Sequence, residues 1–181
     1  MLRNTESTYG KVTIIIHWLM VLMVVTLLTV GFIMADMDKG ATRDSIIGLH
    51  KASGFVLLLL ALFRWYWTLS GQNPKPIEGM TKAEIGISHA AKWTLLLLLL
   101  IMPISGVLMS MYFGYGISVY GLFEIPSFLA KNKDLGEAFE EIHEVIAYIL
   151  IAVFCTTCCS RLKTSFYKQR QYTQPNARQI I

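Results

Sequence analysis

The sequence contains few charged residues and few cysteines, and the positions of both exclude several classes of protein. Only 15% of the residues are charged, whereas 54% are hydrophobic; soluble domains average about 25% charged. This composition excludes a disordered chain and is untypical of a cytosolic enzyme. The three cysteines lie between residues 155 and 159, which excludes a disulfide framework. The basic residues lie beside apolar stretches, so the net charge of +4 indicates membrane topology and not nucleic-acid binding.

Four apolar stretches predict membrane-spanning helices, since about 20 helical residues cross the hydrocarbon. The fourth stretch is long enough only if its helix begins earlier, and Asp134 followed by Glu137 predicts a cap and a start near Leu135. Pro103 is expected to kink the third helix, which membrane helices tolerate. We therefore predict an all-α, four-helix up-down bundle within residues 8–168, with an N-terminal segment 1–11 and a tail 169–181. The predicted spans are 12–34, 46–69, 88–111 and 141–162.

The connecting segments differ in charge and predict the orientation. The N-terminus, residues 70–92 and the tail, with Arg64 at their border, carry eleven basic and three acidic residues; the opposite segments carry five basic and nine acidic ones. The excess of Lys and Arg on one side predicts that both termini are cytoplasmic. The first stretch lacks a small-residue cleavage site and is interpreted as an uncleaved helix.

The chain has four histidines, and each predicted helix contains one near its beginning: His17, His50, His89 and His143. They follow the expected helix caps (Thr8, Thr42, Thr81 and Asp134) by eight or nine residues, or about 12–13 Å along the axis. Because successive helices alternate in direction, His17 and His89 are expected near the cytoplasmic side. His50 and His143 are expected near the outer side.

Two imidazoles at one depth on facing helices are typical of a haem site with iron ligated from both faces. Ionisable residues inside spans are rare and usually functional. Zinc or copper would favour cysteine, carboxylate or a tighter cluster, and a proton relay would favour a mid-membrane carboxylate, which the spans lack. The sequence therefore predicts haem iron bound by His50 with His143, and by His17 with His89.

Three basic residues near these levels are candidates for a haem propionate or a quinone headgroup, with snorkelling to the lipid headgroups as the alternative. They are Lys51, Arg64 and Lys92. Cys155, Cys158 and Cys159 include a C-x-x-C pattern, but a cysteine follows where covalent haem attachment needs histidine. We interpret these cysteines as apolar filling, and their role stays open.

Several short motifs occur in the order of the spans. They are His17-Trp18, His50-Lys51-Ala52-Ser53-Gly54, Pro103-Ile104-Ser105-Gly106 and His143-Glu144. With these motifs the chain resembles the bacterial cytochrome b561 family over about residues 8–168, and also hydrogenase and formate-dehydrogenase cytochrome b subunits. The resemblance implies a multi-pass inner-membrane protein with two haems b, which passes electrons between a donor and ubiquinone.

The sequence departs from this family at the inner site. The family commonly carries a second histidine in the fourth helix, at the position of Thr157, and a third-helix histidine where Lys92 stands. The partner of His17 is therefore His89, a weaker ligand such as Cys158, or nothing; His89 is the residue we predict.

Bis-histidine iron has no open position, so the predicted function is electron transfer across the membrane. The resemblance implies a quinone as one partner and a one-electron donor such as superoxide on the outer side. Two alternatives remain. One alternative is a haem-carrying anchor of a larger dehydrogenase or hydrogenase, and the other is a transporter without haem.

Overall fold

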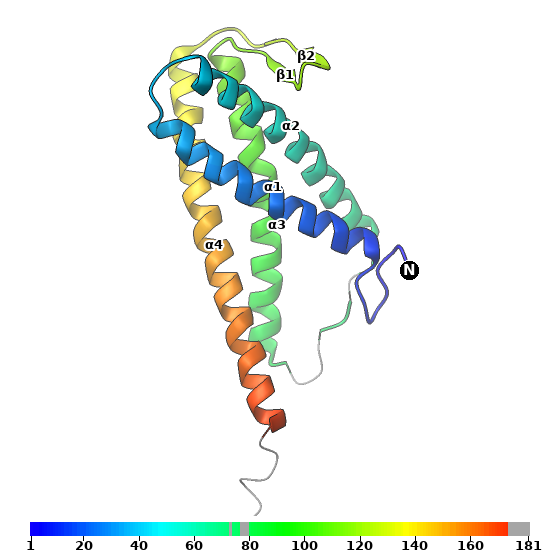
Figure 1. Ribbon diagram of the computed structural model, residues 1–181. Helices are drawn as coiled ribbons and strands as arrows, with labels where there is room; N and C mark the ends of the chain where they lie inside the picture. The colour runs from blue at the N-terminus through cyan, green and yellow to red at the C-terminus, as the bar shows by residue number, and fades with distance from the viewer. Residues whose placement is uncertain (73, 77–79, 174–181) are drawn as a thin grey trace, which may run out of the picture.

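The computed structural model describes residues 1–72, 74–76 and 80–173, with side chains as far as residue 157. Within them the chain forms four long helices and one short hairpin (Figure 1). Along the chain, α1 packs against α2, α2 against α3, and α3 against α4. The elements are α1 (Lys11–Asp36), α2 (Ala41–Ser70), α3 (Lys82–Tyr112), β1 (Ile117–Val119), β2 (Phe123–Ile125) and α4 (Lys133–Thr173).

The beginnings of the helices confirm one predicted cap and correct three. The predicted cap Thr81 forms a capping box with Glu84, in which each side chain accepts a hydrogen bond from the other residue's backbone N–H, at 3.2 and 2.8 Å. The prediction of Asp134 as a cap is wrong, because α4 begins at Lys133 and the side chain of Asn132 accepts from the N–H of Leu135 at 3.1 Å. The predictions of Thr8 and Thr42 are also wrong. The residues before α1 and α2 are Gly10 and Gly40, and neither has a side chain that could cap.

Three helices in the described part of the chain, α1, α2 and α3, are long and apolar enough to cross a membrane. On α1 the large apolar side chains Ile15, Trp18 and Leu22 are 65%, 65% and 66% exposed. A helix that is apolar on all sides is stable only where its outer face meets protein or hydrocarbon. The fold is therefore an all-α membrane fold, and a fourth span in α4 stays a prediction.

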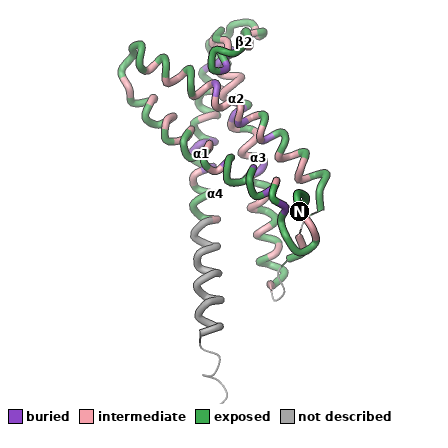
Figure 2. Tube along the Cα trace, turned by 45° about the vertical axis from the view of Figure 1, so that its right-hand side comes forward, coloured by how far each residue is buried: buried purple, intermediate pink, exposed green. Residues whose placement is uncertain are grey.

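The best-packed apolar cluster lies between the first three helices. Ile16 and Met20 of α1 meet Leu57 and Ala61 of α2, and Leu99 of α3 packs beside them. Ala61 is 1% exposed and Met20 is 4% exposed. Figure 2 shows that most of the tube is exposed or intermediate and that the buried positions are few. This packing holds α1 and α2 against α3 on the side of the bundle where the N-terminus lies.

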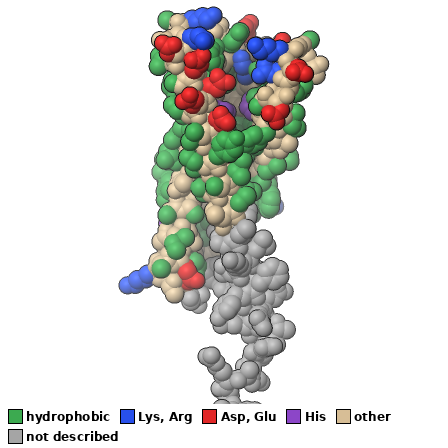
Figure 3. All heavy atoms as spheres, turned by 90° about the vertical axis from the view of Figure 1, so that its left-hand side faces the viewer, with side chains coloured by type: hydrophobic (Ala, Val, Ile, Leu, Met, Phe, Trp, Pro, Cys, Tyr) green, Lys and Arg blue, Asp and Glu red, His purple; other side chains and the backbone are tan. Residues whose placement is uncertain are grey.

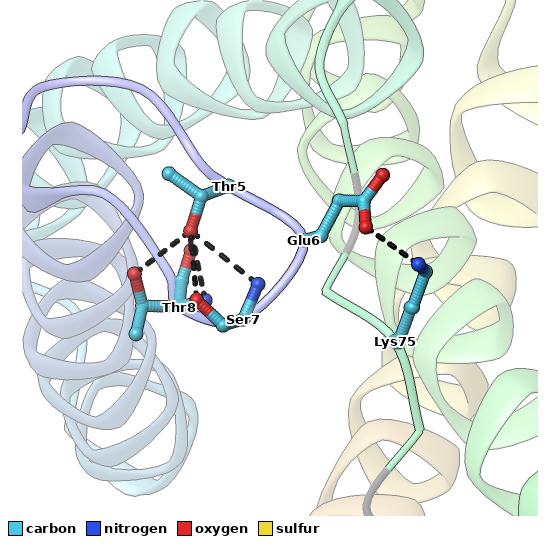
Figure 4. A network of polar contacts seen from close by, with 5 residues as sticks. All are labelled: Thr5, Glu6, Ser7, Thr8 and Lys75. Carbon is cyan, nitrogen blue, oxygen red and sulfur yellow. Dashed lines mark hydrogen bonds and ion pairs between the residues drawn. The ribbon is translucent and has the colours of Figure 1, made fainter.

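The N-terminal segment and the α2–α3 connection lie together at one end of the molecule. The amide of Asn4 donates to the carbonyl of Gln72 at 3.1 Å, and the backbone N–H of Lys75 donates to the carbonyl of Glu6 at 2.9 Å. Lys75 and Glu6 also form an ion pair beside the turn around Thr5 (Figure 4). The α1–α2 turn and the hairpin lie at the other end (Figure 1). Among the described residues, the N-terminal segment and the α2–α3 connection thus lie at the end opposite the α1–α2 turn and the hairpin.

Candidate functional site

His50 of α2 and His143 of α4 lie across from one another near the hairpin end. Their ring centroids are 6.5 Å apart and their planes are inclined by 78°. A metal ion held between two imidazoles lies about 2 Å from each nitrogen, and ring centres about 1 Å farther out are then roughly 6 Å apart. The separation of the ring centres is therefore of the size expected if both imidazoles bound one metal ion.

Each of these rings lies against a glycine of a neighbouring helix. A Cβ atom at Gly106 of α3 would lie 3.0 Å from Cε1 of His143, which is closer than ordinary contact. A Cβ atom at Gly31 of α1 would lie 3.5 Å from Cε1 of His50. The absence of a side chain at Gly106 is thus a condition for the position of the His143 ring.

The orientation of His143 is set by α3. Its Nδ1 lies 3.0 Å from the carbonyl oxygen of Met102 and 2.9 Å from Oγ of Ser105. The Ser105 hydroxyl donates to the same carbonyl at 2.7 Å, so its oxygen is free to accept from the imidazole. Because a carbonyl accepts only, the proton of neutral His143 lies on Nδ1, and Nε2 keeps the lone pair that binds a metal.

His50 presents a different environment. Its Nδ1 is buried and has no hydrogen-bond partner among the described atoms of the chain. A buried imidazole nitrogen without a partner is unfavourable by about 1–3 kcal/mol. Three observations point to a group supplied from outside the chain: this nitrogen without a partner, the spacing of the two rings, and the glycine beside each ring. The residues present fit a haem.

An apolar cavity extends from the two histidines toward the middle of the bundle. Its walls include Val24 and Leu27 of α1, Leu57 of α2, Leu99 and Pro103 of α3, and Leu150 of α4. Figure 3 shows charged side chains of both signs at this end of the molecule, with histidine below them and hydrophobic surface farther down. Apolar walls exclude water and suit the faces of a macrocycle.

The segment between α3 and α4 covers the beginning of α2, next to His50. Ile117 of β1 and Ala52 of α2 are each 1% exposed, and β1 packs on α2. The phenol of Tyr120 and the hydroxyl of Ser53 share a hydrogen bond of 2.7 Å. The ammonium group of Lys51 lies 4.8 Å from the centre of the Tyr115 ring, so this propionate candidate contacts an aromatic face.

The turn of the hairpin carries backbone strain. Tyr120 has φ 52° and Gly121 has φ 73°, and the N–H of Leu122 donates to the carbonyl of Val119 at 3.0 Å. Two residues with positive φ make the tight turn that suits a hairpin, but a residue with Cβ is disfavoured there by about 1–2 kcal/mol. The bond from Tyr120 to Ser53 offsets this strain and attaches the hairpin to the turn that follows His50.

At the inner level the structure does not bring the predicted pair together. His17 is exposed and lies edge-on to Trp18, with ring centroids 5.7 Å apart. His89 is also exposed, and in the described part of the chain no ring contact joins it to His17. The half-buried guanidinium of Arg64 donates to the carbonyl of Thr13 at 3.1 Å. The half-buried Lys92 has its ammonium 5.6 Å from the Trp93 ring centre.

Comparison with known proteins identifies the family of this chain. Residues 8–156 match the family described as prokaryotic cytochrome b561. The chain belongs to this family. It is 26% identical over 151 residues to cytochrome b561 homolog 2 of Escherichia coli strain K12. These residues make up 83% of this chain and 80% of that relative.

Membership of the cytochrome b561 family makes the chain a b-type haem protein of a bacterial membrane that takes part in electron transfer. The ligand assignments stay predictions, and the outer assignment has the geometry described above. In the fourth helix, the hydroxyl of Thr157 donates to the carbonyl of Val153 at 2.6 Å. Cys155 is exposed, whereas the side chains of Cys158 and Cys159 lie outside the described residues.

Sequence reasoning missed three groups around the outer histidines. Two of them are Gly31 and the carbonyl of Met102. The sequence does not indicate which glycine or which backbone carbonyl of a helix contacts a histidine on another helix. The bond between Tyr120 and Ser53 joins residues 67 positions apart. Ser53, Ser105 and Gly106 were within quoted motifs, but the groups that they contact could not be inferred from those motifs.

Proposed function

We propose that this chain transfers electrons between a one-electron donor on the outer side of a bacterial inner membrane and a quinone in the bilayer. One observation carries the proposal: His50 and His143 are spaced as the two axial ligands of one haem. Such a haem has no open coordination position, so it transfers electrons and does not activate oxygen.

The residues of the site have separate roles in this function. His50 and His143 would hold the haem iron. The Met102 carbonyl and Ser105 contact Nδ1 of His143, which would leave its Nε2 for the metal. The apolar walls exclude water and limit the dielectric constant around the site. When bound, the haem supplies a reversible one-electron change at iron. Lys51 stays a candidate for the outer propionate.

The electron donor and the quinone acceptor are proposed from the family resemblance and from the number of electrons that each one exchanges. Superoxide is a candidate donor, since it loses one electron to become dioxygen. Two such electrons and two protons convert a quinone to a quinol, and ubiquinone is the quinone we propose. Four acidic residues at the start of α4 (Glu137, Glu140, Glu141 and Glu144) are exposed. They lie at the end that we propose to be outer, where charge steers small donors or proteins.

The topology that we propose is a four-helix up-down bundle with both termini in the cytoplasm. It is supported by the two sets of connections at opposite ends and by the charge difference of eleven basic residues against five. Within this topology α4 is the fourth span. A second haem between His17 and His89, with Arg64 and Lys92 near its propionates or a quinone, stays a prediction from the sequence.

A haem-carrying anchor subunit of a larger dehydrogenase or hydrogenase is the second candidate function. The hairpin region favours it, because Leu122 is 81% exposed and Phe128 is 73% exposed at the outer end. Exposed apolar groups of this kind either enter the headgroup layer or bind a partner. Quinone reduction by the purified chain alone, with a chemical donor, would exclude a pure anchor.

The test of the proposed site is an absorption spectrum of the purified chain and of two variants. The wild type should show Soret and α bands that sharpen on reduction. His50→Ala or His143→Ala should remove the contribution of the outer haem to these bands while membrane insertion is unchanged, because each leaves only one imidazole at the site. Full haem content in either variant would refute the assignment of the outer haem.

A further inference from the structure

The two outer histidines differ in what surrounds their Nδ1 atoms. Nδ1 of His143 has two oxygen atoms within hydrogen-bond distance, the Met102 carbonyl at 3.0 Å and Oγ of Ser105 at 2.9 Å. Nδ1 of His50 is buried and has no hydrogen-bond partner among the described residues. For a haem held by both rings, the described part of the chain thus supplies acceptors behind one axial ligand only.

The geometry on α3 makes Ser105 an acceptor for His143. The Ser105 hydroxyl donates to the Met102 carbonyl at 2.7 Å, so its one proton is used within α3. Its oxygen then presents lone pairs to Nδ1 of His143, because a hydroxyl has one proton and two acceptor positions. Ser105 is 2% exposed, so bulk water does not compete for this position. The N–H of His143 is therefore shared between two oxygens whose places are fixed by one helix.

Acceptors behind an imidazole change its strength as a metal ligand. When Nδ1–H donates to oxygen, electron density moves toward Nε2 and the ring becomes a more basic ligand. Ferric iron carries one more positive charge than ferrous iron, so it gains more from a basic ligand. Surroundings of low dielectric constant strengthen the effect, and the walls of the adjoining cavity are largely apolar, with Leu57, Leu99 and Leu150 among them.

We infer that Ser105 is a positioning residue that lowers the reduction potential of the outer haem by accepting a hydrogen bond from His143. The inference rests on the proposed function, since it requires His143 to be an axial ligand. Potentials of haem proteins depend on the ligands and on the hydrogen bonds around them. A lower potential makes the reduced haem a stronger reductant toward a quinone. It also requires a more strongly reducing donor on the outer side.

The experiment is a redox titration of the intact, purified chain, followed by absorption, for the wild type and for Ser105→Ala. The outer component of the titration is the one that His143→Ala removes. In Ser105→Ala the affinity for ferric relative to ferrous haem should fall about 2- to 10-fold, the effect of one hydrogen bond. At about 59 mV per tenfold change, the potential of this component should rise by about 20–60 mV.

Two further measurements separate this role from a general effect on packing. The low-spin spectrum should persist in Ser105→Ala, because both imidazoles stay bound. The matched control is Ser110→Ala, since Ser110 is also 2% exposed on α3 but donates to the carbonyl of Tyr115, at 3.2 Å. This substitution should leave the potential of the outer component unchanged.

The outcomes distinguish the inference from the function on which it rests. An unchanged or lower potential in Ser105→Ala, loss of its low-spin spectrum, or an equal rise in Ser110→Ala would overturn the inference and leave the proposed function intact. A titration in which His143→Ala removes no component would overturn the proposed function itself. If His143→Ala does not accumulate in the membrane, His50→Ala identifies the same component.

Discussion

Replacement of Gly106 by alanine should weaken haem binding more than alanine at other glycines of the bundle. The new Cβ would lie 3.0 Å from Cε1 and 3.3 Å from Nδ1 of His143. Optimal contact is about 3.5–4.0 Å, so the ring must move by roughly 0.5 Å or more. Overpacking of this size is unfavourable by about 1–3 kcal/mol, which corresponds to a haem affinity about 5- to 150-fold lower.

Two other glycines provide graded controls for this experiment. At Gly31 the added Cβ would meet Cε1 of His50 at 3.5 Å, an ordinary contact, and at Gly48 it would meet nothing within 4 Å. Alanine also favours a helix by about 0.8–1.0 kcal/mol over glycine, so Gly31→Ala and Gly48→Ala should fold normally. Haem titration of the three apoproteins should give affinities in the order Gly48→Ala, Gly31→Ala, Gly106→Ala, strongest first. An unchanged affinity in Gly106→Ala, or an equal loss in Gly48→Ala, would refute the reasoning.

Three further predictions concern orientation, access and topology. Ser105→Ala should keep the haem but bind it about 2- to 10-fold more weakly, because one hydrogen bond of about 0.5–1.5 kcal/mol is lost. The control is Ser110→Ala on the same helix, which should not change haem affinity, since Ser110 is as buried as Ser105, at 2% exposed. Equal effects of the two substitutions would contradict a role for Ser105. Tyr120→Phe removes the hydrogen bond to Ser53 and should speed haem reduction by bulky outer donors up to about fivefold, without loss of haem. The rates are measured by stopped flow, with Ser118→Ala as the control. Identical rates would show that the hairpin only connects α3 to α4. A reporter fused after Ile181 should be active only in the cytoplasm, and activity only outside it would reverse the orientation.

The helices were predictable because their signals are local. Apolar length alone identifies α1, α2 and α3, and the capping box of Thr81 with Glu84 is readable in four residues. The other caps were not predictable in the same way. Gly10 and Gly40 precede helices without any side-chain signal. Asn132 competes with Asp134, which is two residues too late to cap a helix that begins at Lys133.

The proximity of His50 and His143 was predictable, but their surroundings were not. The two histidines lie in separate helices, and helical rise is sufficient to bring them to one level. The bond from His143 to the Met102 carbonyl depends on how α3 is rotated against α4, and the bond from Tyr120 depends on the path of the hairpin. Neither rotation nor loop path can be inferred from spacing along a helix.

Equal depth predicted two pairs of histidines, but depth does not distinguish a ligand from a histidine on an exposed face. What distinguishes the two levels is the space beside each ring. A metal-binding imidazole needs a neighbour that leaves room for it and an acceptor that fixes its proton. His143 has both, in Gly106 and Met102, and His50 has Gly31 and a nitrogen with no partner in the described chain. The glycines beside His50 and His143 depend on how the helices are rotated against one another, which the position of a histidine along its own helix does not give.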